Sequence, residues 1–461
     1  MIKNKIFSNF NFSWKNVCQN FFLIFSVVFF FNAINFSCSA HLEKNETQGS
    51  QKILLEFIHD KNEEFTIEKI SKNKNLNWQK PEKHKISFGY TNAPYWFKFN
   101  FENKNPEKHF YFEFSNPLLG DIEFYIPKKN NKFKKIKTGT FYPFDSRPIK
   151  NKNFIFSSKN SGAFYFRIKT LSPFSFDLKV FDEHFFYKEK NSSDKFLWIF
   201  FGAMFVIFFH NIFIFLAIRD KNYFYSAFLV LFLTLFMFWD KGLGFQFFWP
   251  NCPWFQNHCV YFFLSCVFIS TVFYFKEFLD LKKFLPKIYK IFVINVWVCV
   301  PMVIASIFFL KTHIHIIEFF YSLWILILII NILVILIFAI KKKLREAIFV
   351  TIGFLAILFS AIFVTLECFF PIFHIPNIMQ ISSLFMILTF SAGLADKINL
   401  TKNKFLKANA KLKNLDQMKN NFLAMVSHKL RTPLASMRWF LEMFLNEDFG
   451  KINKDQKENL E

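Results

Sequence analysis

The apolar residues of the chain follow three successive patterns. From about Ile53 to Phe185 they recur at every second position, which is the period of a strand that buries one face. In Tyr95–Phe101, YWFKFNF, the phenylalanines share one side and the residues between them share the other. The same alternation returns at 110–114, 164–168 and 174–180, with turn sequences between the runs. Several short strands separated in this way predict an antiparallel β-sandwich.

The second pattern is a series of apolar runs, each long enough to form a helix that spans a membrane. We place seven of them at Phe196–Ile218, Tyr223–Trp239, His258–Phe275, Ile288–Leu310, Ile316–Ile340, Ala347–Phe370 and Asn377–Ala395. The chain is therefore predicted to be an integral membrane protein with a seven-helix bundle over residues 196–395.

The third pattern begins after Ala395, where the chain turns polar but keeps a seven-residue apolar repeat. Over 396–420 this repeat predicts a short parallel coiled coil that dimerises the protein. The apolar stripe then changes register from Leu423 onward, as at a stutter. Gly450 interrupts the predicted helix, and a second helix is expected to begin near Asn453.

A shorter apolar run near the N-terminus has a different meaning. Phe21–Phe31 follows three lysines and precedes the small residues of Ser37–Ala40. This order is typical of a secretory signal peptide, so we expect residues 1–40 to be removed. An uncleaved anchor is the alternative, but the run is well below the ~20 residues that a membrane span needs.

Basic residues between the membrane runs indicate how the protein is oriented. Lysines and arginines gather in the first, third and fifth loops and after the last run. The second and fourth loops hold one lysine each, and the sixth holds no basic residue. Because basic loops remain in the cytoplasm, the sandwich is predicted to lie outside the cell and the segment after residue 395 inside it.

Composition excludes several functions. The net charge of +23 could indicate nucleic-acid binding, but many lysines lie in these short loops, so no nucleic-acid partner is expected. The seven cysteines lie in the targeting region or in and beside the membrane runs, so the sandwich must fold without disulfides. A retinal protein would need a lysine in the last run, and a proton-coupled transporter would need several buried ionisable groups. Histidines near the outer loops share no ligand spacing, and no metal is predicted.

Near its end the chain carries NFLAMVSHKLRTPL, Asn421–Leu434, in which His428 projects from the polar side of the predicted helix. A solvent-facing imidazole can accept a phosphoryl group, because its unprotonated nitrogen is a nucleophile. The segment resembles the phosphoacceptor box of sensor histidine kinases, usually Ser-His-Glu-Leu-Arg-Thr-Pro-Leu, and differs at one position. The resemblance implies that His428 accepts the phosphate, that Arg431, Thr432 and Pro433 belong to the site, and that a response regulator is a partner.

The position that differs is Lys429. In that family an acidic residue follows the histidine and acts as the base, a task that a charged lysine cannot perform, so autophosphorylation is expected to be weak. The chain also reaches Glu461 without the family's Asn-rich and Gly-rich ATP-binding boxes. We expect no cofactor in this chain, with ATP and Mg bound only by a catalytic domain supplied in trans or lost by truncation. Whether the protein is itself an enzyme stays open.

A second resemblance covers the preceding domains. Gly89–Lys104, GYTNAPYWFKFNFENK, and Gly202–Val230, GAMFVIFFHNIFIFLAIRDKNYFYSAFLV, resemble bacterial seven-transmembrane receptors with diverse intracellular signalling modules. The resemblance implies a jelly-roll-like sensor domain that binds carbohydrate or a similar small ligand. Trp96, Arg147 and Arg167 are candidate ligand-binding residues, because aromatic rings stack on sugars and arginine pairs with carboxylates. Burial in a Phe-rich core is the competing interpretation.

These inferences predict a multidomain membrane protein. Its parts are a signal peptide (1–40), an extracytoplasmic β-sandwich sensor domain (41–190), a seven-transmembrane domain (196–395), a cytoplasmic coiled-coil linker (396–420) and an incomplete helical-hairpin dimerisation domain (421–461). The predicted function is a homodimeric receptor in the bacterial plasma membrane that senses a ligand outside and presents His428 to a two-component phosphorelay. The alternative is a non-enzymatic receptor that only dimerises with, or titrates, a partner kinase.

Overall fold

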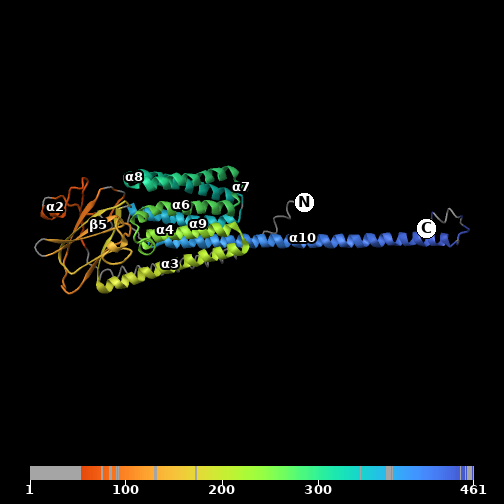
Figure 1. Ribbon diagram of the computed structural model, residues 1–461, viewed down its shortest axis with the longest axis horizontal. Coiled ribbons are helices and arrows are strands. Elements are labelled where there is room, and N and C mark those ends of the chain that lie inside the picture. The colour runs from red at the N-terminus through yellow and green to blue at the C-terminus, as the bar shows by residue number, and fades with distance from the viewer. Residues whose placement is uncertain are drawn as a thin grey trace. The chain divides into compact units, whose positions relative to one another are not determined.

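The computed structural model describes most of the chain from residue 53 onward (Figure 1). The residues outside the description are 1–52, 74–75, 82–85, 90, 92, 129–131, 172–173, 343, 370–374, 376, 447, 452, 454–458 and 460–461. The predicted signal peptide therefore lies outside the described residues, as does most of the second helix expected after Asn453.

The first domain is built from antiparallel strands. They are β1 (Glu56–His59), β2 (Ile86–Gly89), β3 (Tyr95–Phe101), β4 (Phe110–Phe114), β5 (Asp121–Pro127), β6 (Phe133–Thr138), β7 (Phe154–Ser158), β8 (Gly162–Lys169), β9 (Phe174–Phe176) and β10 (Leu178–Asp182). One sheet has the strand order β1-β3-β8-β5-β6, and facing it are the sheets β10-β4-β7 and β2-β9. This arrangement confirms the predicted antiparallel sandwich.

Phenylalanines from both layers form the core of the sandwich. Phe124 of β5 stacks on Phe156 of β7 with ring centroids 4.3 Å apart, and Phe97 of β3 meets Phe176 of β9 edge-on at 5.2 Å. All four rings are at most 1% exposed. Burying one such side chain contributes roughly 1.5–3 kcal/mol, so a core of this kind can hold the domain without disulfides.

The apolar run at 174–180 forms two strands where the alternation predicts one. β9 ends at Phe176 and β10 begins at Leu178, each in a different sheet. Asp177 between them bonds to Ser115: the Ser115 amide donates to the Asp177 carbonyl at 3.0 Å, and the Asp177 amide donates to Ser115 Oγ at 2.8 Å. The chain thus crosses between sheets without interrupting its period of two.

A short helix that the alternation does not predict, α2 (Ile67–Lys72), covers the outer face of the five-stranded sheet. Thr66 caps it by accepting a hydrogen bond from the Lys69 amide at 3.4 Å. Ile70 packs with Trp96 and with tyrosines of β5 and β8 in a second, smaller core. Trp96 therefore does face outward from β3, but it is buried beneath α2.

Seven segments of the described residues are long and apolar enough to cross a membrane. They lie in α3 (Glu183–Ile218), α4 (Lys221–Asp240), α6 (Pro253–Phe278), α8 (Pro286–Lys341), α9 (Glu346–Phe369) and α10 (Ile378–Leu445). α8 supplies two of them, Pro286–Phe308 and Phe319–Lys341, and the connection between these two is helical where the sequence predicts a loop. Short helices α5 (Leu243–Phe247) and α7 (Leu281–Phe284) lie between the long ones. The predicted number of spans is confirmed.

Close helix packing in the membrane domain depends on glycine. A Cβ on Gly353 of α9 would lie 2.3 Å from Thr389 Oγ1 and 3.2 Å from the Met386 Cα, both on α10. Nearby, the ring of Tyr274 on α6 stacks on Phe390 of α10 at 5.0 Å. Small residues that let two helix backbones approach are a principal source of cohesion between membrane helices.

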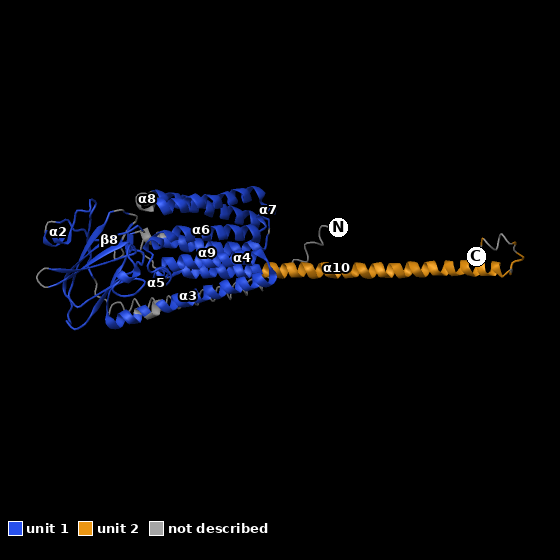
Figure 2. Cartoon of the chain, viewed as in Figure 1, with its two compact units in different colours: residues 1–394 blue, residues 395–461 orange. Residues whose placement is uncertain are grey.

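The chain divides into two compact units, residues 1–394 and 395–461 (Figure 2). The described part of the second unit is the remainder of α10 followed by a few residues. Nearly all its side chains are exposed. A coiled coil requires a second helix, so the coiled coil over 396–420 stays a prediction.

Candidate functional site

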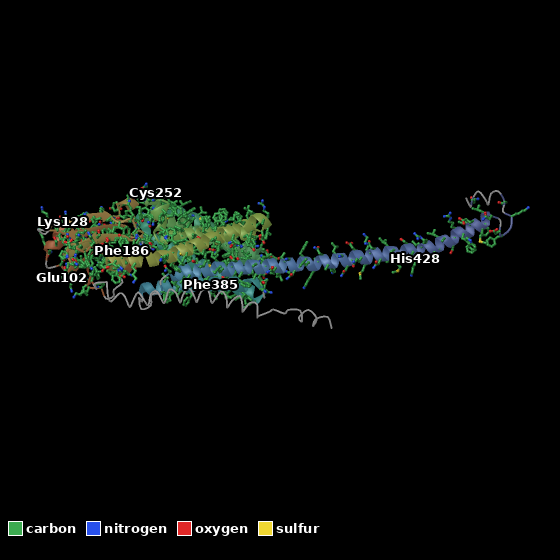
Figure 3. All side chains as sticks on the ribbon, turned by 90° about the horizontal axis from the view of Figure 1, so that it is seen from below. Glu102, Lys128, Phe186, Cys252, Phe385 and His428 are labelled. Atoms are coloured by element: carbon green, nitrogen blue, oxygen red, sulfur yellow. The ribbon has the colours of Figure 1, made fainter. Side chains whose placement is uncertain are left out.

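His428 lies on α10, and its side chain is exposed (Figure 3). Lys429, Arg431, Thr432 and Pro433 are exposed on the same helix. Thr432 Oγ1 donates to the backbone carbonyl of His428 at 3.5 Å. Pro433 has no N–H, so the carbonyl of Lys429 one turn earlier lacks its usual helical partner. The predicted site residues thus occupy one helical stretch that another molecule can approach.

Lys429 has no carboxylate partner among the described residues, whereas Arg438 further along α10 pairs with Glu442 at 2.9 Å. The described surroundings of His428 therefore supply no acid that could replace the expected base. If a base acts on the His428 ring, it must come from another molecule or from outside the described residues.

Apolar side chains of α10 are also exposed on both sides of His428. Leu412, Phe422 and Leu434 are 60%, 62% and 60% exposed. A helix with such a stripe gains most of its stability from packing its apolar face against a partner. The stripe is therefore a surface that lacks its partner within the described chain.

Trp96, predicted to contact ligand, is 1% exposed. Its indole N–H donates to Asp60 Oδ2 at 3.3 Å, and its ring stacks on Tyr125 at 5.5 Å. Its surroundings are those of a core residue that anchors the segment leading into α2. A role in ligand binding stays a prediction.

Arg147, also predicted to contact ligand, is 2% exposed. Its Nη1 donates to the carbonyls of Asn151, at 2.7 Å, and Lys152, and its guanidinium lies 4.0 Å from the ring centroid of Phe154. Burial lowers the pKa of Arg147 to about 9. The side chain stabilises the loop between β6 and β7 through these hydrogen bonds. A role of Arg147 in ligand binding stays a prediction.

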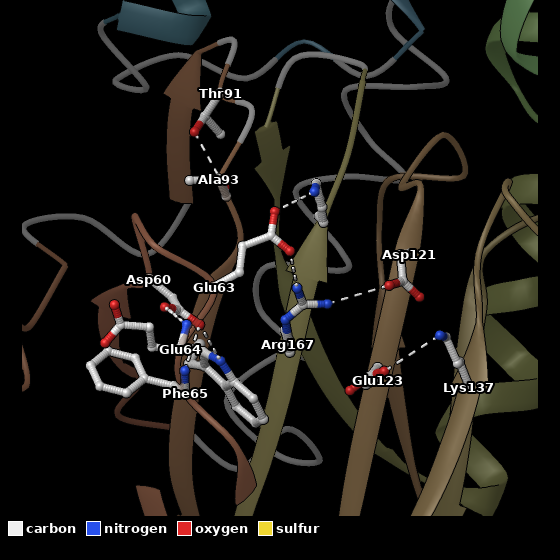
Figure 4. Close-up of polar contacts among 12 residues, drawn as sticks. Asp60, Glu63, Glu64, Phe65, Thr91, Ala93, Asp121, Glu123, Lys137 and Arg167 are labelled. Atoms are coloured by element: carbon white, nitrogen blue, oxygen red, sulfur yellow. Dashed lines mark hydrogen bonds and ion pairs between the residues drawn. The ribbon is translucent and has the colours of Figure 1, made fainter. Parts of the chain in front are cut away.

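Arg167, the third candidate, is the centre of an ion cluster on the outer face of the five-stranded sheet (Figure 4). Its Nη2 lies 3.2 Å from Glu63 Oε2, and its Nη1 lies 3.4 Å from Asp121 Oδ2. Lys169 pairs with the other oxygen of Glu63, and the Tyr142 hydroxyl donates to Asp121 Oδ1 at 3.0 Å. The structure thus places Trp96 and Arg167 opposite one another in the register of β3 and β8, on the outer face of the sheet, and places Arg147 apart from them in the loop between β6 and β7.

No pattern in the sequence identifies the partners of Arg167. Asp121 and Lys169 are cross-strand neighbours in the register of β5 and β8, and Glu63 reaches the sheet from a turn. An alternation of period two shows on which face of a sheet a side chain lies, but it does not show which strand pairs with its own. The only local signal was the run of charged and polar residues around Glu63.

The loop between β6 and β7 joins the sandwich to the membrane helices. Asn257 of α6 accepts from Thr140 Oγ1 at 2.9 Å and donates to the Thr140 carbonyl at 3.0 Å. The Phe144 amide donates to the Pro250 carbonyl at 2.8 Å, and its ring meets Phe245 of α5 edge-on at 5.7 Å. We call these contacts the junction.

Gly242 makes close approach at the junction possible. Its φ is +69°, and a Cβ there would lie 2.6 Å from Pro117 Cβ. Lys152 adds an ion pair with Asp194 of α3 at 2.7 Å. Several independent contacts thus fix the sandwich to the end of the helix bundle.

Among the described residues, no group of three or more His, Cys, Asp or Glu side chains is placed so that it could hold a metal ion. His258, one of the histidines considered in the sequence, places its Nδ1 2.6 Å from the Trp254 carbonyl and stacks on the Trp254 ring at 4.7 Å.

Comparison with known families matches three parts of the chain. Residues 54–182 match the 7TMR-DISM extracellular 2 domain, residues 193–397 match the 7TM diverse intracellular signalling domain, and residues 418–461 match the His Kinase A (phospho-acceptor) domain. No curated protein matches the chain. A phosphoacceptor domain of this kind implies dimerisation and a response regulator as partner. The chain therefore belongs to the seven-transmembrane receptors with diverse intracellular signalling modules and, by its phosphoacceptor domain, is a multi-pass membrane sensor of two-component signalling.

Proposed function

We propose that this receptor binds a small ligand on its sandwich, outside the cell, and thereby controls phosphorylation of His428 in the cytoplasm. The observation that carries the proposal is α10, a single helix of 68 residues that contains the last membrane span and His428. A rotation or shift of the span would move the His428 region with it, since a helix transmits such motions along its axis. Exposed His428 is the acceptor on this path.

The distribution of charge supports the proposed orientation. Lysines follow the membrane span of α10 and gather in the connection between α6 and α8 and in that between α8 and α9. The connection between α4 and α6, whose Pro250 carbonyl accepts from the Phe144 amide at the junction, carries Lys241 as its one basic residue. Basic connections favour the cytoplasmic side, so the sandwich faces outward in this proposal.

The proposed reaction transfers the γ-phosphoryl group of ATP to a ring nitrogen of His428, as the bond from the γ-phosphorus to ADP breaks. ATP and Mg²⁺ are supplied with a catalytic domain acting in trans, and a response regulator then takes the phosphoryl group. This chain contributes the exposed acceptor and the helix that positions it. Lys429 cannot act as the base, so transfer is slow unless the catalytic partner supplies one.

Dimerisation on the exposed stripe of α10 completes the proposal. Leu412 and Leu415 lie before His428, and Leu434 and Met437 lie after it, all more than half exposed. Two copies that pack along this stripe would remove these side chains from water while leaving polar positions such as His428 outside. The phosphoacceptor would then be presented on the surface of a dimer.

The test supplies a histidine-kinase catalytic domain and labelled ATP to the full chain in lipid vesicles. Label that is acid-labile and disappears in His428→Gln supports the proposal. His109→Gln, which changes an exposed histidine of the sandwich, is the matched control and should keep the label. No label in the unaltered protein would instead favour the alternative, a receptor that only binds or titrates a partner kinase.

A further inference from the structure

The turn before α2 lies over the outer face of the five-stranded sheet and is fixed there by carboxylates. Asp60 is 2% exposed and accepts from the amide of Glu64 at 2.9 Å and from the Trp96 indole at 3.3 Å. Glu63, at the tip, is 44% exposed and reaches Arg167 and Lys169 (Figure 4). The base of the turn is therefore buried, and its tip is accessible.

Glu63 has a backbone conformation that a side chain disfavours. Its φ is +56°, in the left-handed region that residues other than glycine rarely adopt. Such strain persists only where other contacts compensate for it, and it recurs at ligand clamps and switches. Here the compensating contacts are the hydrogen bond from the Glu63 amide to the Asp60 carbonyl, at 3.3 Å, and the pairs that the Glu63 carboxylate forms with two cations.

The two oxygens of Glu63 are divided between these cations. Oε2 lies 3.2 Å from Arg167 Nη2, while Oε1 pairs with Lys169 Nζ. The second terminal nitrogen of Arg167, Nη1, lies 3.4 Å from Asp121 Oδ2. A free carboxylate could form the same two pairs if the Glu63 side chain swung away, because this side chain is 44% exposed while Asp60 holds the backbone of the turn in place.

We propose that Arg167 and Lys169 form a binding site for the carboxylate of a small organic acid, and that Glu63 is an internal carboxylate which occupies this site until the ligand displaces it. This site would give the proposed receptor its class of ligand, and it rests on the proposed receptor function. Charge indicates the class of ligand. Arg167 and Lys169 are neutralised by Glu63 and Asp121, so displacing Glu63 leaves one positive charge without a partner carboxylate. A neutral sugar would not replace the ion pairs that are lost.

The same cluster leads toward the junction. Arg167 pairs with Asp121, and Asp121 accepts from the Tyr142 hydroxyl at 3.0 Å. Tyr142 lies in the loop that also carries Thr140 and Phe144, which bond to α6 and to the Pro250 carbonyl. A ligand that replaces Glu63 as a partner of Arg167 can also change the pair between Arg167 and Asp121. That pair is the first of a series of contacts that ends on the membrane helices.

The test measures binding of succinate to the full chain in lipid nanodiscs by calorimetry at constant ionic strength. Glu63→Gln removes the internal competitor, so succinate should bind about three- to tenfold tighter than to the unaltered protein. Glu64→Gln removes the same charge one residue further on, from a carboxylate that bonds Asn62 and not Arg167, and should leave the affinity unchanged. Adding Lys169→Gln to Glu63→Gln should weaken binding about tenfold.

Several outcomes would overturn the inference. One is equal succinate affinity in the unaltered protein and in Glu63→Gln. Another is no loss with Lys169→Gln, at a side chain that is 37% exposed, where the fold can accommodate the change. Binding of succinamide, which lacks the carboxylates, or of inorganic phosphate as tightly as succinate would reject the carboxylate class. The calorimetric measurement of succinate binding does not involve His428, and the labelling of His428 requires no ligand. A negative result for the carboxylate site is therefore distinguishable from a negative result for the receptor proposal.

Discussion

Lys429 occupies the position at which a base is expected beside His428, and its ammonium has no lone pair with which to accept a proton. Replacing it with an acid, Lys429→Glu, should therefore raise phosphate labelling of His428 by a supplied catalytic domain at least tenfold, since a positioned general base contributes roughly 10²–10⁴-fold. The measurement is the initial rate of acid-labile labelling. Lys419→Glu makes the same charge change on an exposed part of α10 and should leave the rate unaltered. Equal rates in the two variants would contradict the role assigned to this position.

Glu63 makes a second prediction at the scale of single residues, through pH. The hydrogen bond from Lys169, together with the charges of Lys169 and Arg167, holds the pKa of Glu63 below its ordinary value of 4.5. A carboxyl whose pKa is depressed by folding stabilises the protein above its unfolded pKa, and that contribution is lost as pH falls through the folded pKa. The contribution is small, no more than about 1 kcal/mol, because the pair is partly exposed.

The midpoint of thermal unfolding checks this sign. The unaltered protein should unfold at a higher temperature than Glu63→Gln at pH 7, and the gap should close progressively as pH falls below 4.5. A gap that stays constant down to pH 3 would mean that Glu63 stabilises the turn by something other than its charge.

At the scale of elements, Gly353 tests how closely α9 and α10 must pack. Gly353→Leu places a side chain against Thr389 and the backbone at Met386, so it should destabilise the bundle by about 1–3 kcal/mol, the usual range for overpacking. Gly202→Leu on α3 is the matched control, because a Cβ there meets no atom within 4 Å. Thermal unfolding in nanodiscs should show a lower midpoint for Gly353→Leu alone. Similar midpoints would show that the two helices can separate without loss.

The elements that could be predicted from the sequence are those in which burial imposes a period. β3 was predicted at its observed bounds because alternate phenylalanines enter one core, and the membrane helices were predicted because lipid demands apolar runs. The same period placed Trp96 on the outer side of β3, yet it carries no information about α2, which covers that side. Whether an outward aromatic meets solvent or another element depends on a contact distant in sequence.

The candidate ligand residues show the same limit. Arginine favours ligand recognition as a residue type, but Arg147 is enclosed by backbone carbonyls and aromatic rings, and only Arg167 lies in a cluster with an accessible carboxylate. His428 could be placed correctly on an exposed helix because its motif is local and its helix presents it outward. Residues joined by strand pairing, such as Asp121 and Lys169, had no local signature.

At the scale of the whole molecule, a signal from the sandwich has to pass through the junction to reach the bundle. Asn257 is its central polar contact: it exchanges two hydrogen bonds with Thr140 and donates a third to the Pro253 carbonyl at 2.7 Å within its own helix. Removing the side chain leaves the fold of each domain untouched but takes two bonds from the contact between them. The junction should then open more often without either part unfolding.

Hydrogen exchange measures that opening directly. In Asn257→Ala the amide of Phe144, which donates to the Pro250 carbonyl across the junction, should exchange about tenfold faster, as expected for the loss of roughly 1.4 kcal/mol from two hydrogen bonds. Amides in β3 and β8 at the core of the sandwich should keep their protection. Asn331→Ala is the control, since the Asn331 amide donates to the Ile327 carbonyl of its own helix, at 2.8 Å, and takes no part in the junction. If Phe144 exchanges equally in both variants, the polar contact does not hold the junction, and the packing of Phe144 on Phe245 is the coupling that remains.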